Sequence, residues 1–162
     1  MSQHIKDIEK KLKRPFPVHQ VKWRPGKGGM ELSYIDARDV MSRLDSVFGI
    51  NNWQVAYEWL GERMICSLAC RVEDEWITKA DGHGDTDIEP KEGGISKALV
   101  RAANTWGIGR YLYHEKAFDR NRNPASWATP EGYDALLEER EKAPVTKLHT
   151  TERIDDTKKE SS

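Results

Sequence analysis

Cysteine is scarce in this sequence, which contains only Cys66 and Cys70. Two thiols four residues apart, with no second pair, fit neither a disulfide framework nor a zinc knuckle. Both fall on one face of a strand that we predict over residues 64–72, because side chains alternate between the two faces of a strand. We therefore expect two reduced core residues in a cytoplasmic protein.

Long apolar runs are also missing. The longest uncharged apolar stretch, residues 64–70, is far too short to cross a membrane. Residues 1–13 are charged throughout and do not have the pattern of a signal peptide. A membrane partner is therefore not expected.

The motifs of common catalytic sites are absent as well. The sequence has no nucleophile elbow, no phosphate-binding loop and no dinucleotide fingerprint. The stretch Gly107-Ile-Gly-Arg110 follows a predicted helix rather than a strand, which is the wrong context for a phosphate-binding turn. We expect no catalytic residue, no cofactor and no metal site, so the chain is not expected to be an enzyme.

The formal net charge is only −1, but the charges are distributed in blocks. Residues 1–30 and 95–124 carry +6 and +4, whereas residues 31–94 and 125–162 carry −8 and −3. A polyanion responds to the local field within about 10 Å rather than to the total charge. The two basic blocks are candidate contacts for a polyanion, although a mixed soluble surface explains the same pattern.

Hydrophobic periodicity predicts an α+β fold. A helix begins after Asp36, a good N-cap, and ends at Gly49; further helices are expected near residues 5–12 and 96–106. Alternating patterns predict strands over residues 53–59, 64–72 and 76–80. We expect an antiparallel meander of three to four strands packed on helices. We expect residues 1–141 to form one domain with a core over about 16–118, and residues 142–162 to form a disordered charged tail.

The helix predicted over residues 96–106 has a polar face of interest. Lys97, Arg101 and Asn104 recur at helical spacing, and Arg110 follows in a segment that also contains two tyrosines. Basic groups interleaved with aromatic rings are what sequence-tolerant binding of a single nucleic-acid strand requires. A solvated helix face is the alternative interpretation of the same pattern.

The segment 81–94 is rich in glycine and aspartate and is expected to form a long loop. Asp81, His83, Asp85 and Asp87 have ligand types that could hold Mg²⁺ or Mn²⁺, as in a metal-dependent nuclease. A flexible acidic loop is the other interpretation, and the sequence does not reveal the strand-supported carboxylate cluster that a nuclease needs. An oligomeric interaction module that does not bind DNA is a further alternative.

Three stretches together resemble the Rad52/Rad22 annealing proteins, in the compact form found in phages and bacteria. They are LSYIDARDV at residues 32–40, VFGINNW at 47–53 and ALVRAANTWGIGRYLY at 98–113. The resemblance implies a β-β-β-α core assembled into an oligomeric ring or an open helical oligomer. It also implies single-stranded DNA in a basic groove and strand annealing in recombination and repair, without ATP or a catalytic metal. A single-strand-binding protein or an exonuclease is a possible partner.

The resemblance carries over to individual positions. Arg38 and Arg101 fall on residues that contact the DNA backbone in the family, whereas Arg63 and, more loosely, Lys91 fall near a second DNA site. The sequence also departs from the family pattern, because Val100 and Asn104 stand where groove cations are common. Lys97, one turn before Arg101, compensates for the missing charge in this interpretation.

Overall fold

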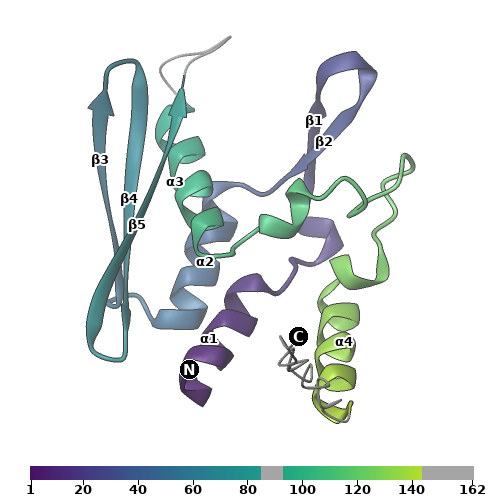
Figure 1. Ribbon diagram of the computed structural model, residues 1–162. Coiled ribbons are helices and arrows are strands. Elements are labelled where there is room, and N and C mark those ends of the chain that lie inside the picture. The colour runs from purple at the N-terminus through teal and green to yellow at the C-terminus, as the bar shows by residue number, and fades with distance from the viewer. Residues whose placement is uncertain (85–92, 144–162) are drawn as a thin grey trace, which may run out of the picture.

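The computed structural model describes residues 1–84 and 93–143 (Figure 1). The helices of these residues are α1 (Gln3–Lys13), α2 (Ala37–Phe48), α3 (Gly94–Thr105) and α4 (Pro130–Lys142). The strands are β1 (Lys22–Pro25), β2 (Glu31–Tyr34), β3 (Trp53–Leu60), β4 (Arg63–Val72) and β5 (Glu75–Gly84). Single 3₁₀ turns lie at Val18–Gln20, Lys27–Gly29, Arg110–Tyr113 and Ser126–Ala128. The α+β class predicted from the sequence is confirmed.

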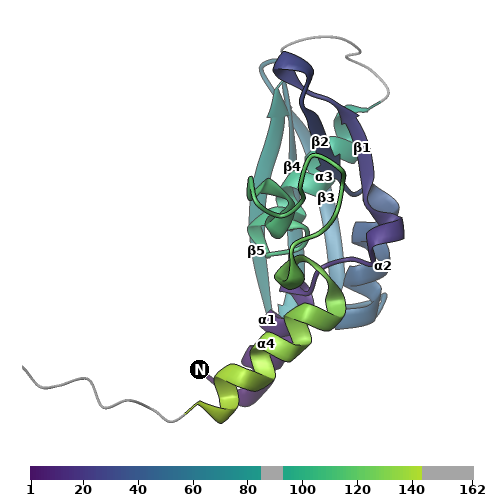
Figure 2. The same cartoon turned by 90° about the vertical axis from the view of Figure 1, so that its right-hand side faces the viewer.

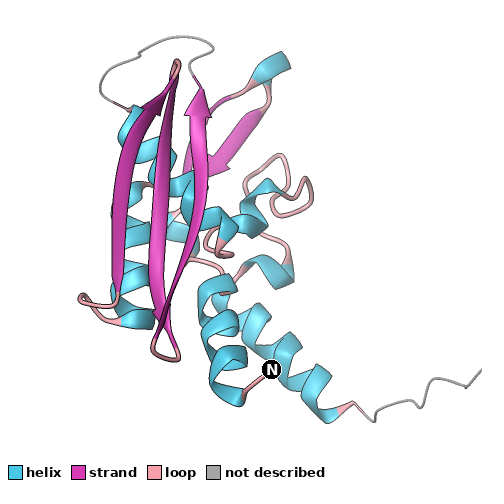
Figure 3. Cartoon of the chain, turned by 60° about the vertical axis from the view of Figure 1, so that its left-hand side comes forward, coloured by secondary structure: helices cyan, strands magenta, loops and turns pink. Residues whose placement is uncertain are grey.

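The predicted meander is an antiparallel sheet with the strand order β3-β4-β5. Alternate residues of the central strand β4, from Met64 to Val72, are buried on the face that α3 covers. Figure 3 shows the helices gathered on this one face of the sheet. Both cysteines belong to the buried set and have no exposed surface, which confirms their predicted place in the core.

The third strand is longer than the sequence indicated. We expected it to end at residue 80, but β5 continues to Gly84 because β4 offers pairing partners as far back as Arg63. Asp81 pairs with Cys66 and His83 with Met64 in the ladder. The loop expected over residues 81–94 is therefore wrong for its first four residues, and the part at 85–92 lies outside the described residues.

Helix α2 has the bounds that its caps predict. The Asp36 side chain accepts hydrogen bonds from the backbone N–H groups of Arg38 and Asp39, and the Asp39 side chain accepts one from the Asp36 N–H. Gly49 ends the helix with φ of 84°, a conformation that favours glycine. The apolar stripe of α2, with Val40 and Leu44 fully buried, packs between α1 and α3.

Two parts of the fold were not predicted from the sequence. Residues 26–29 were expected to form only a loop, but they join β1 and β2 in a separate antiparallel hairpin. Figure 1 shows this hairpin on the far side of α3 from the three-stranded sheet. The edge of the Trp23 ring packs against Phe118, with 5.1 Å between the ring centroids. Contacts from a distant segment thus hold a hairpin that is too short to be stable by itself.

Helix α4 is the second unpredicted element. The Thr129 side chain caps it, and Pro130 occupies its first turn, where the missing N–H costs nothing. It runs antiparallel to α1, and the ion pairs Lys10–Glu141 and Arg14–Asp134 join the two helices (Figure 2). The tail predicted over residues 142–162 lies outside the described residues from residue 144 onward. Across the parts of the chain with described structure, no helix is long and apolar enough to cross a membrane.

Candidate nucleic-acid interface

The exposed flank of α3 runs along the inner face of the edge strand β5. Lys79, Asp81 and His83 lie on this inner face, because they pair with the buried residues Leu68, Cys66 and Met64 of β4. Helix α3 contacts both strands, so the polar side chains of β5 lie beside its exposed side. Cations from two elements are thereby brought to one place. Lys79, Lys97 and Arg101 are called the α3–β5 basic strip below.

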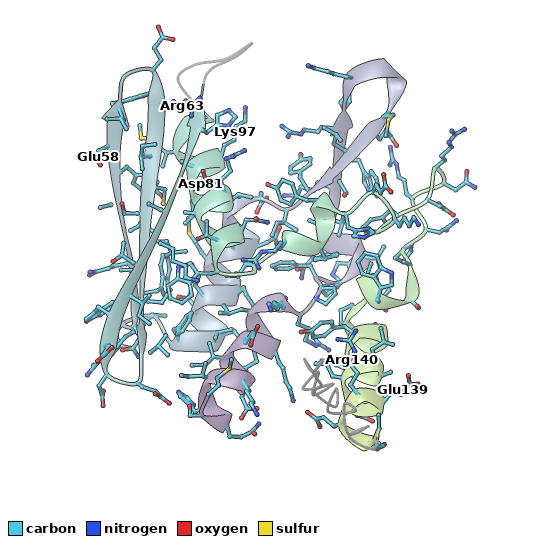
Figure 4. The ribbon with its side chains drawn as sticks, in the orientation of Figure 1. Glu58, Arg63, Asp81, Lys97, Glu139 and Arg140 are labelled. Carbon is cyan, nitrogen blue, oxygen red and sulfur yellow. The ribbon has the colours of Figure 1, made fainter. Side chains whose placement is uncertain are left out.

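Arg101 is at the middle of this strip. Its Nε atom lies 3.6 Å from Oδ2 of Asp81, and the two side chains are 46% and 36% exposed. Exposed pairs of this kind contribute about 0–1 kcal/mol, because water screens them. A phosphate that approaches Arg101 therefore competes with a weak partner. Lys97 lies one turn nearer the N-terminus of α3, and Figure 4 shows it at the same end of the sheet as Asp81.

Lys79 extends the strip toward the C-terminus of α3. Its Nζ atom lies 4.9 Å from the centre of the Trp106 ring and donates a hydrogen bond to the Thr105 carbonyl at 3.4 Å. The sequence interpretation did not select Lys79. The alternation along the strand predicted over residues 76–80, now β5, could have identified it, because it places residue 79 on the same face as the buried side chains of β4.

Arg110 closes the C-terminus of α3. Its guanidinium donates hydrogen bonds of 2.8–3.0 Å to the carbonyl oxygens of Asn104 and Thr105, and the Asn104 carbonyl also accepts one from the Gly107 N–H. The Asn104 side chain is half-buried, and its Nδ2 atom has no hydrogen-bond partner among the described residues. The predicted role of both residues in DNA binding stays a prediction.

The two tyrosines of the Arg110–Tyr113 turn differ in exposure. The Tyr111 hydroxyl accepts a hydrogen bond from the Phe16 N–H at 3.1 Å, and burial raises the pKa of this phenol. Tyr113 is 66% exposed. Of this predicted stacking pair, Tyr113 is therefore the ring that a base can reach.

Arg38 is the second residue of α2, and its side chain is exposed. Two acids flank it in the sequence: Asp39 accepts a hydrogen bond from the Asp36 N–H, and Asp36 is engaged by the Lys22 ammonium and by two backbone N–H groups. The Lys22 contact holds the pKa of Asp36 below its ordinary value, so this carboxylate stays charged and occupied. No ion pair or side-chain hydrogen bond involves the Arg38 guanidinium within residues 1–84 and 93–143. Its full charge is therefore available to a ligand.

Arg63 lies on a different surface. It is the first residue of β4 and alternates with buried Met64, so it belongs to the sheet face opposite α3. It also lies at the same end of the sheet as Lys97 (Figure 4). The assignment of Arg63 to a second DNA site stays a prediction. Lys91, the other residue assigned there, lies outside the described residues.

The metal ligands of the nuclease alternative are only partly described. Asp81 pairs with Arg101, and both Asp81 and His83 are strand residues rather than members of a free loop. Asp85 and Asp87 lie outside the described residues. Within the chain segments that the structure describes, no three side chains of histidine, cysteine, aspartate or glutamate lie close enough together to bind one metal ion.

The family and the relatives that this chain resembles are described as DNA repair or single-stranded DNA-binding proteins. Residues 4–64 match the model of the "Rad52/22 family double-strand break repair protein". The chain is 32% identical over 146 residues to the single-stranded DNA-binding protein DdrA of Deinococcus deserti, covering 78% of this chain and 72% of that protein. It is 32% identical over 117 residues to DdrA of Deinococcus radiodurans, covering 67% of this chain and 56% of the relative.

Proposed function

Because the chain belongs to the Rad52/22 family of double-strand break repair proteins, we propose that it binds single-stranded DNA along the α3–β5 basic strip. The relatives from both Deinococcus species are single-stranded DNA-binding proteins by name. The observation that carries the proposal is the alignment of Lys97, Arg101 and Lys79 from two elements along one exposed flank.

The spacing of the strip suits a nucleic-acid backbone. Lys97 and Arg101 are one helical turn apart, which is about 6 Å along the helix axis. Cations at this separation can contact neighbouring phosphates, and an arginine can do so through two parallel hydrogen bonds. Such contacts ignore base identity, so the proposed binding is sequence-tolerant. Arg38 adds an unneutralised guanidinium, and Tyr113 an exposed ring for stacking.

We propose further that binding leads to annealing of complementary strands in double-strand break repair, without ATP and without catalysis. Phosphate contacts leave the base edges of a bound strand free to pair. A second strand then pairs with bases that are already held extended and concentrated on the protein. No bond is made or broken in this process, so it needs no catalytic residue.

Annealing in this form requires several copies of the chain, and we propose an oligomeric ring or helical assembly. The edge strand β3 ends in Trp59 and Leu60, whose side chains are 59% and 68% exposed. Apolar side chains at an open sheet edge favour association with another copy. Further partners, a single-strand-binding protein or an exonuclease, stay predictions.

A fluorescence assay tests the annealing proposal. Two complementary oligonucleotides are mixed without nucleotide or metal, and the pairing rate is compared between the wild type and Arg38→Ala/Arg101→Ala. The expected result is acceleration by the wild type and its loss in a double variant that still folds and elutes at the wild-type size. Arg71→Ala is the matched control, because Arg71 is also an exposed arginine in an ion pair, with Asp74.

The outcomes separate the alternatives. If the folded wild type does not accelerate pairing, the annealing proposal fails. If the double variant anneals at the wild-type rate, the proposed location of the DNA fails although the function stands. An assembly that forms normally but does not retain single-stranded DNA would instead favour the oligomeric interaction module.

A further inference from the structure

A second surface feature begins where the α3–β5 basic strip ends, since Arg110 of this feature and Lys79 of the strip both donate to the Thr105 carbonyl. It is an open cleft of about 400 Å³ between α4, the end of α1 and the segment that follows α3. Its floor is largely apolar and includes Pro15, Trp127, Leu136 and Leu137. Figure 3 shows α4 well separated from the three-stranded sheet that bears Lys79 and Asp81.

The residues that α4 contributes form one stripe. Tyr133, Leu136, Leu137 and Arg140 recur at helical spacing and all line the cleft. Figure 4 shows Arg140 and Glu139 on different sides of α4. The acids of α4 nearest to α1, Asp134 and Glu141, are paired with Arg14 and Lys10 and do not line the cleft. Helix α4 therefore presents leucine and arginine side chains to the cleft, while its carboxylates point elsewhere.

The rim of the cleft is cationic. Lys13, Arg110 and Arg140 line it, and no carboxylate does. Lys13 is paired with Glu9, and Arg110 donates to the carbonyls at the end of α3 but keeps its charge. Arg140 has no ion pair or side-chain hydrogen bond within the described parts of the chain. An apolar floor beneath positive charge complements a ligand that combines an apolar side chain with carboxylates.

We propose that this cleft docks an acidic peptide of a partner protein, in which a large apolar side chain is flanked by carboxylates. The apolar side chain enters between Trp127 and the two leucines, and the carboxylates meet Arg140 and Lys13. The proposal does not depend on annealing, and the α4 residues that carry it, Leu136, Leu137 and Arg140, are not part of the α3–β5 basic strip. It assigns α4 a role in recruitment of another protein.

The chemistry of the floor favours a peptide over a nucleic-acid strand. Stacking of bases needs free aromatic faces, and the edge-to-face contact of Trp127 with His114, at 5.1 Å between the ring centroids, restricts the aromatic surface that the cleft offers. The Tyr133 hydroxyl donates to the Lys10 carbonyl at 3.4 Å, which fixes this ring against α1. Leu136 and Leu137 are the aliphatic side chains that α4 contributes to the cleft, and they offer packing but no stacking, while Arg140 supplies charge.

Fluorescence anisotropy with a labelled peptide, Gly-Asp-Asp-Asp-Leu-Phe, and the full chain tests the proposal. We expect saturable binding by the wild type, lost when Leu-Phe is replaced by Ser-Ser and weakened by added salt. Arg140→Glu should weaken the binding by about fivefold or more, because it turns an attraction on the rim into a repulsion. Lys142→Glu is the matched control, since it reverses a charge in the same helical turn but off the cleft, and its affinity should stay within about twofold.

Further measurements test whether another ligand occupies the cleft. Leu137→Ala should weaken peptide binding and leave the circular dichroism unchanged. If the Leu137→Ala protein unfolds, the comparison of Arg140→Glu with Lys142→Glu tests the proposal by itself. No saturable binding by the wild type, or equal effects of the two charge reversals, overturns the proposal. Displacement of the peptide by oligothymidylate would make the cleft a nucleic-acid site. Tighter peptide binding by Ile154→Ser/Asp155→Asn/Asp156→Asn would make this chain's own acidic segment the occupant, which also overturns it.

Discussion

Asp81 on β5 and Arg101 on α3 form an ion pair in which Oδ2 and Nε are 3.6 Å apart. The pair joins the edge of the sheet to the helix that covers it, and both side chains are partly exposed. It also places a carboxylate in the middle of the α3–β5 basic strip. A phosphate bound to Arg101 must displace this carboxylate or tolerate its charge, so Asp81 weakens the proposed DNA site.

Removal of the Asp81 charge should therefore improve DNA binding. We expect Asp81→Asn to tighten binding of single-stranded DNA by about threefold at low salt, with a smaller gain as salt screens the charges. Titration of a labelled oligothymidylate measures the change. Asp74→Asn is the control, because Asp74 neutralises Arg71 on another part of the sheet. Weaker binding by Asp81→Asn would mean that Asp81 instead holds Arg101 in the orientation that DNA needs.

Arg110 should contribute to stability rather than to DNA affinity. Its guanidinium donates to two carbonyl oxygens at the end of α3, so Arg110→Ala should lower the free energy of unfolding by about 1–2 kcal/mol. Arg101→Ala should change it by less than about 1 kcal/mol, because its ion pair is exposed. Urea denaturation followed by circular dichroism gives both values. If Arg110→Ala keeps full stability but loses DNA binding, Arg110 is a phosphate contact as the sequence suggested.

The buried thiols predict a loss of stability in alkali. Burial raises the pKa of Cys66 to about 11 and that of Cys70 to about 12, from an ordinary value of 9.0. Below pH 9.0 both the folded and the unfolded chain keep these protons, so the two thiols do not make the free energy of unfolding depend on pH there. As pH rises toward the folded values, the unfolded state loses protons that the native state retains, and stability falls. The urea midpoint should therefore drop steadily above pH 9.0.

Reactivity of the thiols provides a direct check on this account. Only the thiolate reacts with Ellman's reagent, so neither cysteine should react in the native protein near neutral pH, and both should react in urea. Cys66→Ser/Cys70→Ser should reduce the loss of stability in alkali if the doubly substituted chain folds. Rapid reaction of either thiol under native conditions would contradict its burial against α3.

The sequence predicted those parts of the fold whose causes are local. Helix α2 has the predicted bounds because Asp36 and Gly49 act on the backbone beside them. The β3-β4-β5 meander follows from alternation along each strand. The β1–β2 hairpin was missed because its support comes from Phe118 and Arg122, nearly a hundred residues later, the latter pairing with Glu31. Helix α4 was missed because its partners at α1 are still more remote, 120 and 131 residues away in sequence.

Only part of the candidate site was predicted, again because contacts between residues remote in sequence are not visible in the sequence. Helical spacing alone aligns Lys97 with Arg101, and the structure places both along one flank of α3. The approach of β5 to that flank is a tertiary contact, so the sequence interpretation gave neither the pairing of Asp81 with Arg101 nor the contribution of Lys79. It also could not separate Arg110, which hydrogen-bonds the end of its own helix, from an arginine free to meet phosphate.

The salt dependence of single-stranded DNA binding tests the central claim most directly. Each phosphate contact on a single strand adds about 0.7 to the slope of log K against log salt concentration, so Lys79→Ala/Lys97→Ala/Arg101→Ala should reduce that slope by about 2. Arg71→Ala, on the opposite face of the sheet from α3, should leave it unchanged. An unchanged slope in a folded triple variant would contradict the claim that DNA lies along the α3–β5 basic strip.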